Sequence, residues 1–435
     1  DERNAKLVAQ IAHCASGDFY RERFEELGID PTSITSIADL GQIPILVDPK
    51  IHRTLQEESQ LNAAHPFGSH LTVDPTDVVS VSSTSGTTGD PTFYAFTNQD
   101  VAVTDALWQR ALRFVGVRPG DRVLHGFGLS MYLAGIPLIR AMERMGVTPI
   151  PVGAEAGTQK LLRMLELTRP TVLACTPSYA EHLLERAPEV LGKKAAELGI
   201  EKIICAGEPG AGLPAVRNKL QAGWGATVYD MLGGAHGIMM ASCGHAGCFR
   251  MHVLGDDYSV STDLVDPTSK EPLEIEDGIT GERVKTSLEW QAQPPLRYSV
   301  GDVYQVFTSP CESGIEGKSI RVMGRVDDLL IVKGVKLYPA AVKNVVNTFV
   351  PEVTGELRIV LDGPPPRVTP PLRLKIETAA SGDPAAAASL TGRIAAAMHD
   401  RLTVRPEIQL VPAGSLARSS HKTQLVEVLE GGSSQ

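Results

Sequence analysis

The segment SSTSGTTGDPT at residues 82–92 follows a short apolar run, VVSV, at 78–81. Its hydroxyl side chains offer many donors, and Gly86 and Gly89 allow the backbone to bend closely around an anion. A strand that leads into such a loop suits the polyphosphate of a nucleotide. The Gly-Lys-Ser/Thr ending of a P-loop is missing, which excludes that motif. The segment therefore predicts a phosphate-binding loop of another class, with a Ser/Thr/Gly linker as the alternative.

Downstream of this loop, short apolar strands alternate with amphipathic helices, the first of which we expect Asn98 to cap. Strands are expected at 122–128, 148–153, 171–177, 201–207 and 226–232, and further helices at 157–167, 178–187 and 213–222. This rhythm indicates a mostly parallel sheet covered on both faces, with the ligand at the carboxyl ends of the strands. CAGEPG (205–210) and YDMLGGAHG (229–237) fall at such ends.

The pattern changes after residue 252, where alternation and turn signals predict antiparallel strands up to residue 310. We place a domain boundary near Gly324 to Asp328. Beyond it, a hairpin, a helix, two strands around a Pro-rich loop, an Ala-rich helix and a last strand predict a small α+β unit. The expected fold class is α/β. A large multi-layered domain (1–324) combines a mostly parallel sheet with an antiparallel β subdomain, and a small mobile α+β domain (325–435) follows.

Composition narrows the classes of partner. The 435 residues are 43% hydrophobic and 21% charged, with a formal net charge of −10 and no basic run, which argues against nucleic acid as a partner. No run of 18 apolar residues suggests a membrane span. Cys14, Cys175 and Cys205 lie in apolar surroundings, as buried thiols do in a reducing compartment, so we expect a cytoplasmic protein.

Eight segments together resemble the adenylate-forming enzymes of the acyl-CoA synthetase superfamily, specifically the phenylacetate-CoA ligase branch. They occur in the family's order and span nearly the whole chain. In chain order they are HPFGSHL (65–71), SSTSGTTGDPT, TPSYAEHLLE (176–185), CAGEPG, VYDMLGG (228–234), PLRYSVGD (295–302), GRVDDLLIVKGVKLYP (324–339) and GSLARSSHKTQLV (414–426).

The resemblance implies an AMP-forming acid-thiol ligase that uses ATP, Mg²⁺ and coenzyme A. A carboxylate attacks the α-phosphate of ATP, and a thiol then attacks the acyl adenylate. Because the chain contains no carrier domain, free coenzyme A is the favoured acceptor. The alternatives are transfer to a carrier-protein thiol or to an amine, or a degenerate nucleotide-binding homologue. The sequence leaves open whether the protein forms a homodimer.

The resemblance also implies which residues contact the nucleotide. The loop residues that would cradle the β- and γ-phosphates are Ser83, Thr84, Ser85, Gly86, Thr87, Thr88 and Gly89. The walls of the adenine and acyl sites would be Ala206, Gly207, Glu208 and Pro209, with Tyr229 against the adenine and Asp230 and Met231 beside it. Asp302 would bind the ribose hydroxyls, and Arg325 would hold ribose or phosphate.

Further roles fall to the carboxyl-terminal part of the chain. Lys422 would bridge the carboxylate and the α-phosphate during adenylation, acting as a mobile point charge together with Thr84 and Arg325. Asp327 is the hinge candidate, with Asp328 as the alternative. A rotation there would bring Gly334 to the tunnel for the pantetheine arm.

Two positions depart from the family's pattern. Gly233 stands where the family carries the glutamate that helps to hold magnesium, so Glu208 or Asp230 is expected to replace it, unless the triphosphate and water suffice. Asp90 stands where the loop more often carries lysine, which removes one phosphate contact.

The acyl pocket is the least determined part of the sequence. Its expected lining is Phe127, Leu129, Tyr132, Ala206, Gly207, Gly233, Gly234, His236 and Ile238. Two successive glycines leave room for a flat group, and Phe127 and Tyr132 offer aromatic faces. We therefore expect an aromatic, aryl or aryl-acetic, carboxylic acid.

A zinc site is expected in addition. Cys243, Cys248 and His252 follow a Cys-x4-Cys-x3-His spacing, and Cys311 lies in a later loop. Together they resemble a closed structural zinc site, in which His245 is an alternative ligand. The other interpretation is three reduced cysteines beside surface histidines.

Overall fold

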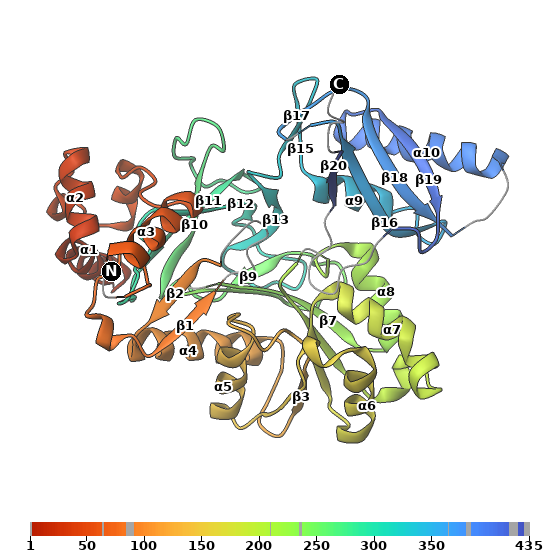
Figure 1. Ribbon diagram of the computed structural model, residues 1–435, viewed down its shortest axis with the longest axis horizontal. Coiled ribbons are helices and arrows are strands. Elements are labelled where there is room, and N and C mark those ends of the chain that lie inside the picture. Colours follow the sequence, from red (N-terminus) through yellow and green to blue (C-terminus); the bar gives the residue numbers. More distant parts are fainter. Residues whose placement is uncertain are drawn as a thin grey trace.

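The computed structural model describes residues 2–62, 65–83, 91–208, 210–234, 237–363, 365–379, 384–416 and 425–429. An eleven-stranded sheet forms its centre, and a smaller sheet with two helices lies at the carboxyl-terminal end of the chain (Figure 1). Among the described residues, no helix combines the length and the apolar character that crossing a membrane requires.

The parallel half of the central sheet confirms the predicted strands. Its members are β3 (Arg122–His125), β4 (Thr148–Pro151), β5 (Val172–Cys175), β6 (Lys202–Cys205) and β7 (Thr227–Gly234). They are joined by α5 (Ile136–Arg144), α6 (Thr158–Thr168), α7 (Pro177–Leu191) and α8 (Pro214–Trp224), and α4 (Asn98–Phe114) precedes them. Their order in the sheet is β7-β6-β5-β3-β4, all in parallel pairs.

The antiparallel strands continue the same sheet beyond β7. They are β8 (Ile238–Ser242), β9 (Met251–Val253), β10 (Ser259–Val265), β11 (Thr280–Ser287), β12 (Tyr298–Phe307) and β13 (Ser319–Arg325). Their order away from β7 is β8-β9-β13-β12-β11-β10. The change from parallel to antiparallel pairing therefore falls between β7 and β8, next to the segment expected to bind adenine.

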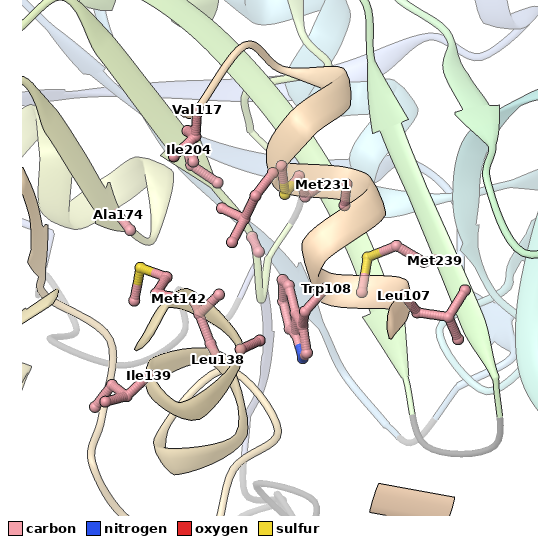
Figure 2. Close-up of a cluster of buried hydrophobic side chains, with 14 of the residues drawn as sticks. Leu107, Trp108, Val117, Leu138, Ile139, Met142, Ala174, Ile204, Met231 and Met239 are labelled. Carbon is pink, nitrogen blue, oxygen red and sulfur yellow. The ribbon is translucent and has the colours of Figure 1, made fainter. Parts of the chain in front are cut away.

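Both faces of the parallel half are covered, because successive side chains of a strand point to opposite faces. Val172, Ala174 and Ile204 pack with α4 and α5 in one buried cluster, called here the α4–α5 core (Figure 2). Leu173 and Ile203 pack with α6, α7 and α8 on the other face.

The amino-terminal end of α4 differs from the expectation for Asn98. Thr97 is the N-cap, since its side chain accepts from the backbone N–H of Asp100 and the Asp100 carboxylate accepts from Thr97 N in return. Asn98 is the first residue inside the helix. The same carboxylate also accepts from the backbone N–H groups of Gln291 and Ala292, which connects the helix to the segment between β11 and β12.

The chain before α4 builds a helical layer and a hairpin; of these, the sequence predicted only the strand that leads into the segment at 82–92. The helices are α1 (Glu2–Ser16), α2 (Asp18–Leu27) and α3 (Pro49–Asn62), and the hairpin strands are β1 (Ser80–Ser83) and β2 (Phe93–Phe96). β1 and β2 pair antiparallel from Ser80 with Phe96 to Ser83 with Phe93. The expected phosphate-binding segment is therefore the connection between these two strands.

The chain beyond β13 has a buried cluster of its own, with members between Leu330 and Val404. Its elements are β14 (Leu330–Val332), β15 (Val335–Leu337), α9 (Pro339–Asn347), β16 (Val353–Leu361), β17 (Arg367–Val368), β18 (Leu372–Thr378), α10 (Pro384–Leu402), β19 (Pro406–Pro412) and β20 (Val426–Val428). β19, β18, β16 and β20 form a four-stranded sheet in that order, in which β20 was not expected.

Candidate functional site

The carboxyl ends of β5, β6 and β7 meet at one edge of the sheet, as parallel pairing requires. Cys175, Cys205 and Asp230 are direct neighbours in the register there. The segment after β6 is held by α7, because the Glu208 carboxylate accepts from the backbone N–H of Ser178 at 2.8 Å, at the start of that helix. Glu208 thus stabilises a helix N-terminus that carries unpaired N–H groups.

Several expected pocket residues lie on the face of the α4–α5 core. Phe127, Ala206 and Met231 belong to this cluster, and Tyr229 packs against it (Figure 2 shows Met231). A Cβ placed on Gly244 would lie 2.6 Å from a ring carbon of Tyr229, so the ring lies directly against the backbone of Gly244. The loop after β8 therefore fixes the residue expected to face adenine.

Alternation along β7 and β8 separates two residues that the sequence analysis placed together. Gly233 faces the α4–α5 core, because a Cβ there would lie 3.2 Å from Met239 Cε and 3.5 Å from Trp108 Cζ2. Gly234 pairs with Ile238 instead, and Ile238 is buried in a different cluster with Met240 and Tyr304. The assignment of Ile238 to the pocket beside Phe127 is therefore wrong.

Trp108 and Met239, which pack on Gly233, are residues that sequence reasoning missed. Both are buried in the α4–α5 core beside Met231 (Figure 2). The signal for Met239 was the period of two along β8, which places it one residue from Ile238 and on the opposite face. Trp108 comes from α4, far from the strand ends in sequence, and no local motif points to it.

The loop after β3 joins the α4–α5 core to the end of β1. Leu129 packs against the α4–α5 core, and its backbone N–H donates to the Glu155 carboxylate at 3.0 Å. Tyr132 is half-buried, with ring carbons 3.2 Å from a Cβ position on Gly128. The carbonyl of Met131 accepts from Ser83 N at 2.8 Å, so this loop touches the last residue of β1.

Asp302 and Arg325 stand opposite each other on β12 and β13. Asp302 lies between two guanidinium groups, 3.2 Å from Arg325 and 3.4 Å from Arg283. Arg325 also holds Asp327 through bonds of 2.8 and 3.1 Å. Asp302 is half-buried, and both guanidinium groups lie beside the carboxylate that we expect to accept from the ribose hydroxyls.

Asp230 lies in a different environment from its neighbours Tyr229 and Met231. It is buried, one of its carboxylate oxygens lies 2.8 Å from a Cβ position on Gly212, and burial raises its pKa to about 7. The buried guanidinium of Arg217 opposes this shift. Asp230 therefore does not share the face of Gly233, and the structure gives no support to it as the replacement magnesium ligand.

Other expected residues lie outside the described residues or in the carboxyl-terminal part of the chain. Outside the described residues are Thr84, Ser85, Gly86, Thr87, Thr88, Gly89, Asp90, Pro209, His236 and Lys422. Gly334 lies in the turn between β14 and β15 with a φ of +85°, a conformation that favours glycine.

A second site lies where the loop after β8 meets the loop after β12. The ligand atoms of Cys243, Cys248, His252 and Cys311 all lie within 4.8 Å of one another. All except Cys243 are buried, and neither ring nitrogen of His252 has a hydrogen-bond partner among the described residues. Three thiols and an imidazole with free nitrogens fit a tetrahedral zinc ion. His245 is not part of this group.

Comparison with known proteins agrees with this geometry. The family model for AMP-binding enzymes matches residues 30–269, and the model for the AMP-binding enzyme C-terminal domain matches residues 334–427. A phenylacetate-coenzyme A ligase of Thermus thermophilus is 30% identical over 435 aligned positions, covering 96% of this chain and 93% of that protein.

Solved structures of 2-hydroxyisobutyryl-CoA ligase are similar over the whole chain. Its postadenylation state, in complex with R3-HIB-AMP, has a TM-score of 0.85 at 26% identity and covers 98% of this chain and 88% of that one. Its thioesterification state, with the same coverage and identity, has a TM-score of 0.67. Fold, site geometry and relatives agree: this chain belongs to the AMP-binding enzyme family, among the adenylate-forming ligases that join an acid to coenzyme A.

Proposed function

We propose that the acid is aromatic, an aryl or aryl-acetic carboxylic acid, which is converted to its acyl adenylate and then to its coenzyme A thioester, with release of AMP and pyrophosphate. The observation that carries this proposal is the set of buried side chains Phe127, Trp108 and Met239 in the α4–α5 core, of which Trp108 and Met239 pack on Gly233. Aromatic rings prefer offset or edge-to-face neighbours, and thioether sulfur packs well on ring edges.

Because Gly233 has no side chain, Met239 and Trp108 pack directly on its backbone. A β-carbon alone would meet Met239 at 3.2 Å. Trp108 and Met239 are 4% and 3% exposed, so they form a buried apolar surface at the carboxyl end of β7. The names of the phenylacetate-coenzyme A ligases among the relatives agree with an aryl-acetic acid.

In the proposed mechanism, the protein supplies positioned charge rather than covalent chemistry. Asp302 accepts hydrogen bonds from the ribose, and Arg325 beside it offsets phosphate charge. Lys422 neutralises the carboxylate and the α-phosphate as they approach each other. Mg²⁺, when bound, neutralises the triphosphate. Of the two carboxylates considered for it, Glu208 fits better because Asp230 is buried with its pKa raised.

A small branched hydroxy acid is the second candidate substrate, favoured by the similarity to 2-hydroxyisobutyryl-CoA ligase. Hydroxylamine trapping with ATP and magnesium over phenylacetate, benzoate, 2-hydroxyisobutyrate and hexanoate separates the two, followed by coenzyme A with each acid that reacts. We expect hydroxamate and thioester from the aromatic acids. Reaction of 2-hydroxyisobutyrate alone would contradict the aromatic proposal, and hydroxamate without thioester would redirect the search to a carrier protein or an amine.

We also propose that Cys243, Cys248, His252 and Cys311 hold a structural zinc ion. When bound, zinc cross-links the loops after β8 and β12. Because Gly244 of the first loop contacts Tyr229, the metal would stabilise the adenine side of the pocket.

We further propose two domains, 1–324 and 325–435, that rotate about Asp327 between the half-reactions. Support comes from the comparison with 2-hydroxyisobutyryl-CoA ligase in two states. The TM-score is 0.85 for its postadenylation state and 0.67 for its thioesterification state, at equal coverage. The conformation described here is thus closer to the postadenylation state.

A further inference from the structure

Strands β1 and β2 flank residues 84–90. On the side of β2 that faces away from β1, side chains from other elements, and not another strand, bond to the backbone. In an antiparallel pair, alternate residues direct their backbone groups away from the partner strand. In β2 these residues are Phe93 and Ala95, because Phe96 bonds toward β1 through Val79. Buried backbone groups of this kind need partners.

Gln56 of α3 supplies two of them. Its side-chain nitrogen donates to the carbonyl of Pro91 at 3.0 Å, and its side-chain oxygen accepts from Phe93 N at 2.7 Å. Gln56 is 3% exposed. The Gln56 amide therefore bonds to the backbone on both sides of Thr92, and one of these bonds is to Pro91, the first described residue after segment 84–90.

His52, one helical turn before Gln56, adds a third bond. Its Nε2 lies 3.0 Å from the carbonyl of Phe93, and its Nδ1 lies 3.0 Å from the hydroxyl of Tyr298. Because a carbonyl only accepts, Nε2 carries the proton and Nδ1 accepts from Tyr298. The hairpin is thereby joined to β12, four residues before Asp302.

Gln293 completes the edge, since its side-chain oxygen accepts from Ala95 N at 2.6 Å. The other end of segment 84–90 is also held from outside the hairpin, where Ser83 N donates to the carbonyl of Met131 at 2.8 Å. Both ends of the segment are thus fixed by groups that belong to other elements.

We infer that His52, Gln56 and Gln293 are positioning residues for the phosphate-binding loop, a role that rests on the proposed assignment of residues 83–89 to the ATP phosphates. The three side chains are at most 3% exposed and act through the backbone of β2. Because these bonds hold the flanking backbone in place, less conformational freedom is lost when a triphosphate binds, so binding is tighter.

The test is Gln56→Met, which keeps the length of the side chain and removes both bonds. Gln10→Met is the matched control. Gln10 is 4% exposed and makes the same pair of bonds to one backbone, donating to Trp290 O at 2.8 Å and accepting from Trp290 N at 2.7 Å. Binding of MgATP and of AMP is measured by calorimetry without any acid, and thermal melting monitors folding.

We expect Gln56→Met to weaken MgATP binding by about tenfold while AMP binding stays within twofold, because AMP lacks the phosphates that the loop holds. Gln10→Met should change neither affinity by more than twofold. An unchanged ratio of the two affinities in Gln56→Met would overturn the positioning role. If Gln56→Met does not fold, Gln56→Glu, which keeps the acceptor for Phe93 N and loses the donor to Pro91, must weaken MgATP selectively.

Failure of the underlying assignment has a different signature. A wild-type protein that binds MgATP no more tightly than AMP would overturn the phosphate-loop assignment itself. Equal behaviour of wild type and both Gln56 variants, with MgATP bound more tightly than AMP, would overturn only the positioning role.

Discussion

Asp302 is the carboxylate that we propose binds the ribose of the nucleotide. Asp302→Asn keeps the shape and removes the charge between Arg325 and Arg283, which lie 3.2 and 3.4 Å away. We expect the KM for ATP to rise by about tenfold and the affinity for AMP to fall equally, since both nucleotides carry the ribose. Asp105→Asn is the control, because Asp105 also lies between two arginines, Arg140 and Arg144, but on α4. An Asp302 variant with unchanged AMP affinity would contradict the ribose role.

The buried imidazole of His52 allows a prediction of how the free energy of unfolding responds to acid. Burial lowers the pKa of His52 to about 4, below its ordinary value near 6.5. The unfolded chain therefore takes up a proton first, so stability is complete above pH 6.5 and is lost as the pH falls toward 4. The loss assigned to this residue is at most roughly 3 kcal/mol.

Urea titrations of wild type and His52→Gln at pH 7 and 4.5 check this. We expect the wild type to lose more stability than the variant between the two pH values. His70, whose pKa burial also lowers, stays in both proteins, but its ring lies 4.5 Å from that of His52, so the comparison reports His52 together with its effect on His70. Parallel losses would show that His52 does not titrate in this range.

At the scale of elements, we expect a bound zinc ion to join the two loops that carry the cysteines. We expect Cys311→Ser to reduce bound zinc from about one per chain to well below one half, and to lower the melting temperature. Cys14→Ser is the control, because Cys14 is also buried but lies on α1, outside the cluster. Metal analysis of the purified proteins, before and after a chelator, gives the readout. A wild-type protein without zinc and unaffected by the chelator would contradict the site.

How much the sequence could predict also depends on the element. The strands of the parallel half were predictable because apolar runs and helical periodicity are local signals. The position of Ile238 was not, since it depends on the register in which Gly234 pairs with Ile238, and one residue of offset exchanges the two faces. The bond between Gln293 and the outer edge of β2 at Ala95 joins residues 198 positions apart, and only the three-dimensional fold reveals such a pairing.

At the scale of the whole molecule, the two half-reactions are expected to need different arrangements of the same parts. Asp327 is exposed and follows Arg325, the last residue of β13. Because proline fixes φ, Asp327→Pro should hold one arrangement. We expect adenylation to stay within threefold and thioester formation to fall by at least tenfold, whereas Asp327→Ala should retain both. Hydroxamate formation and coenzyme A transfer measure the two steps separately. Equal losses in both steps would contradict the hinge.

The side chains that complete the outer edge of β2 also have a consequence for self-association. An uncovered strand edge is a template on which strands of other molecules can add and begin aggregation. Here Gln56, His52 and Gln293 already occupy the outward-facing groups at Phe93 and Ala95. The same three residues that we infer to position the phosphate-binding loop therefore also protect the hairpin from intermolecular strand addition.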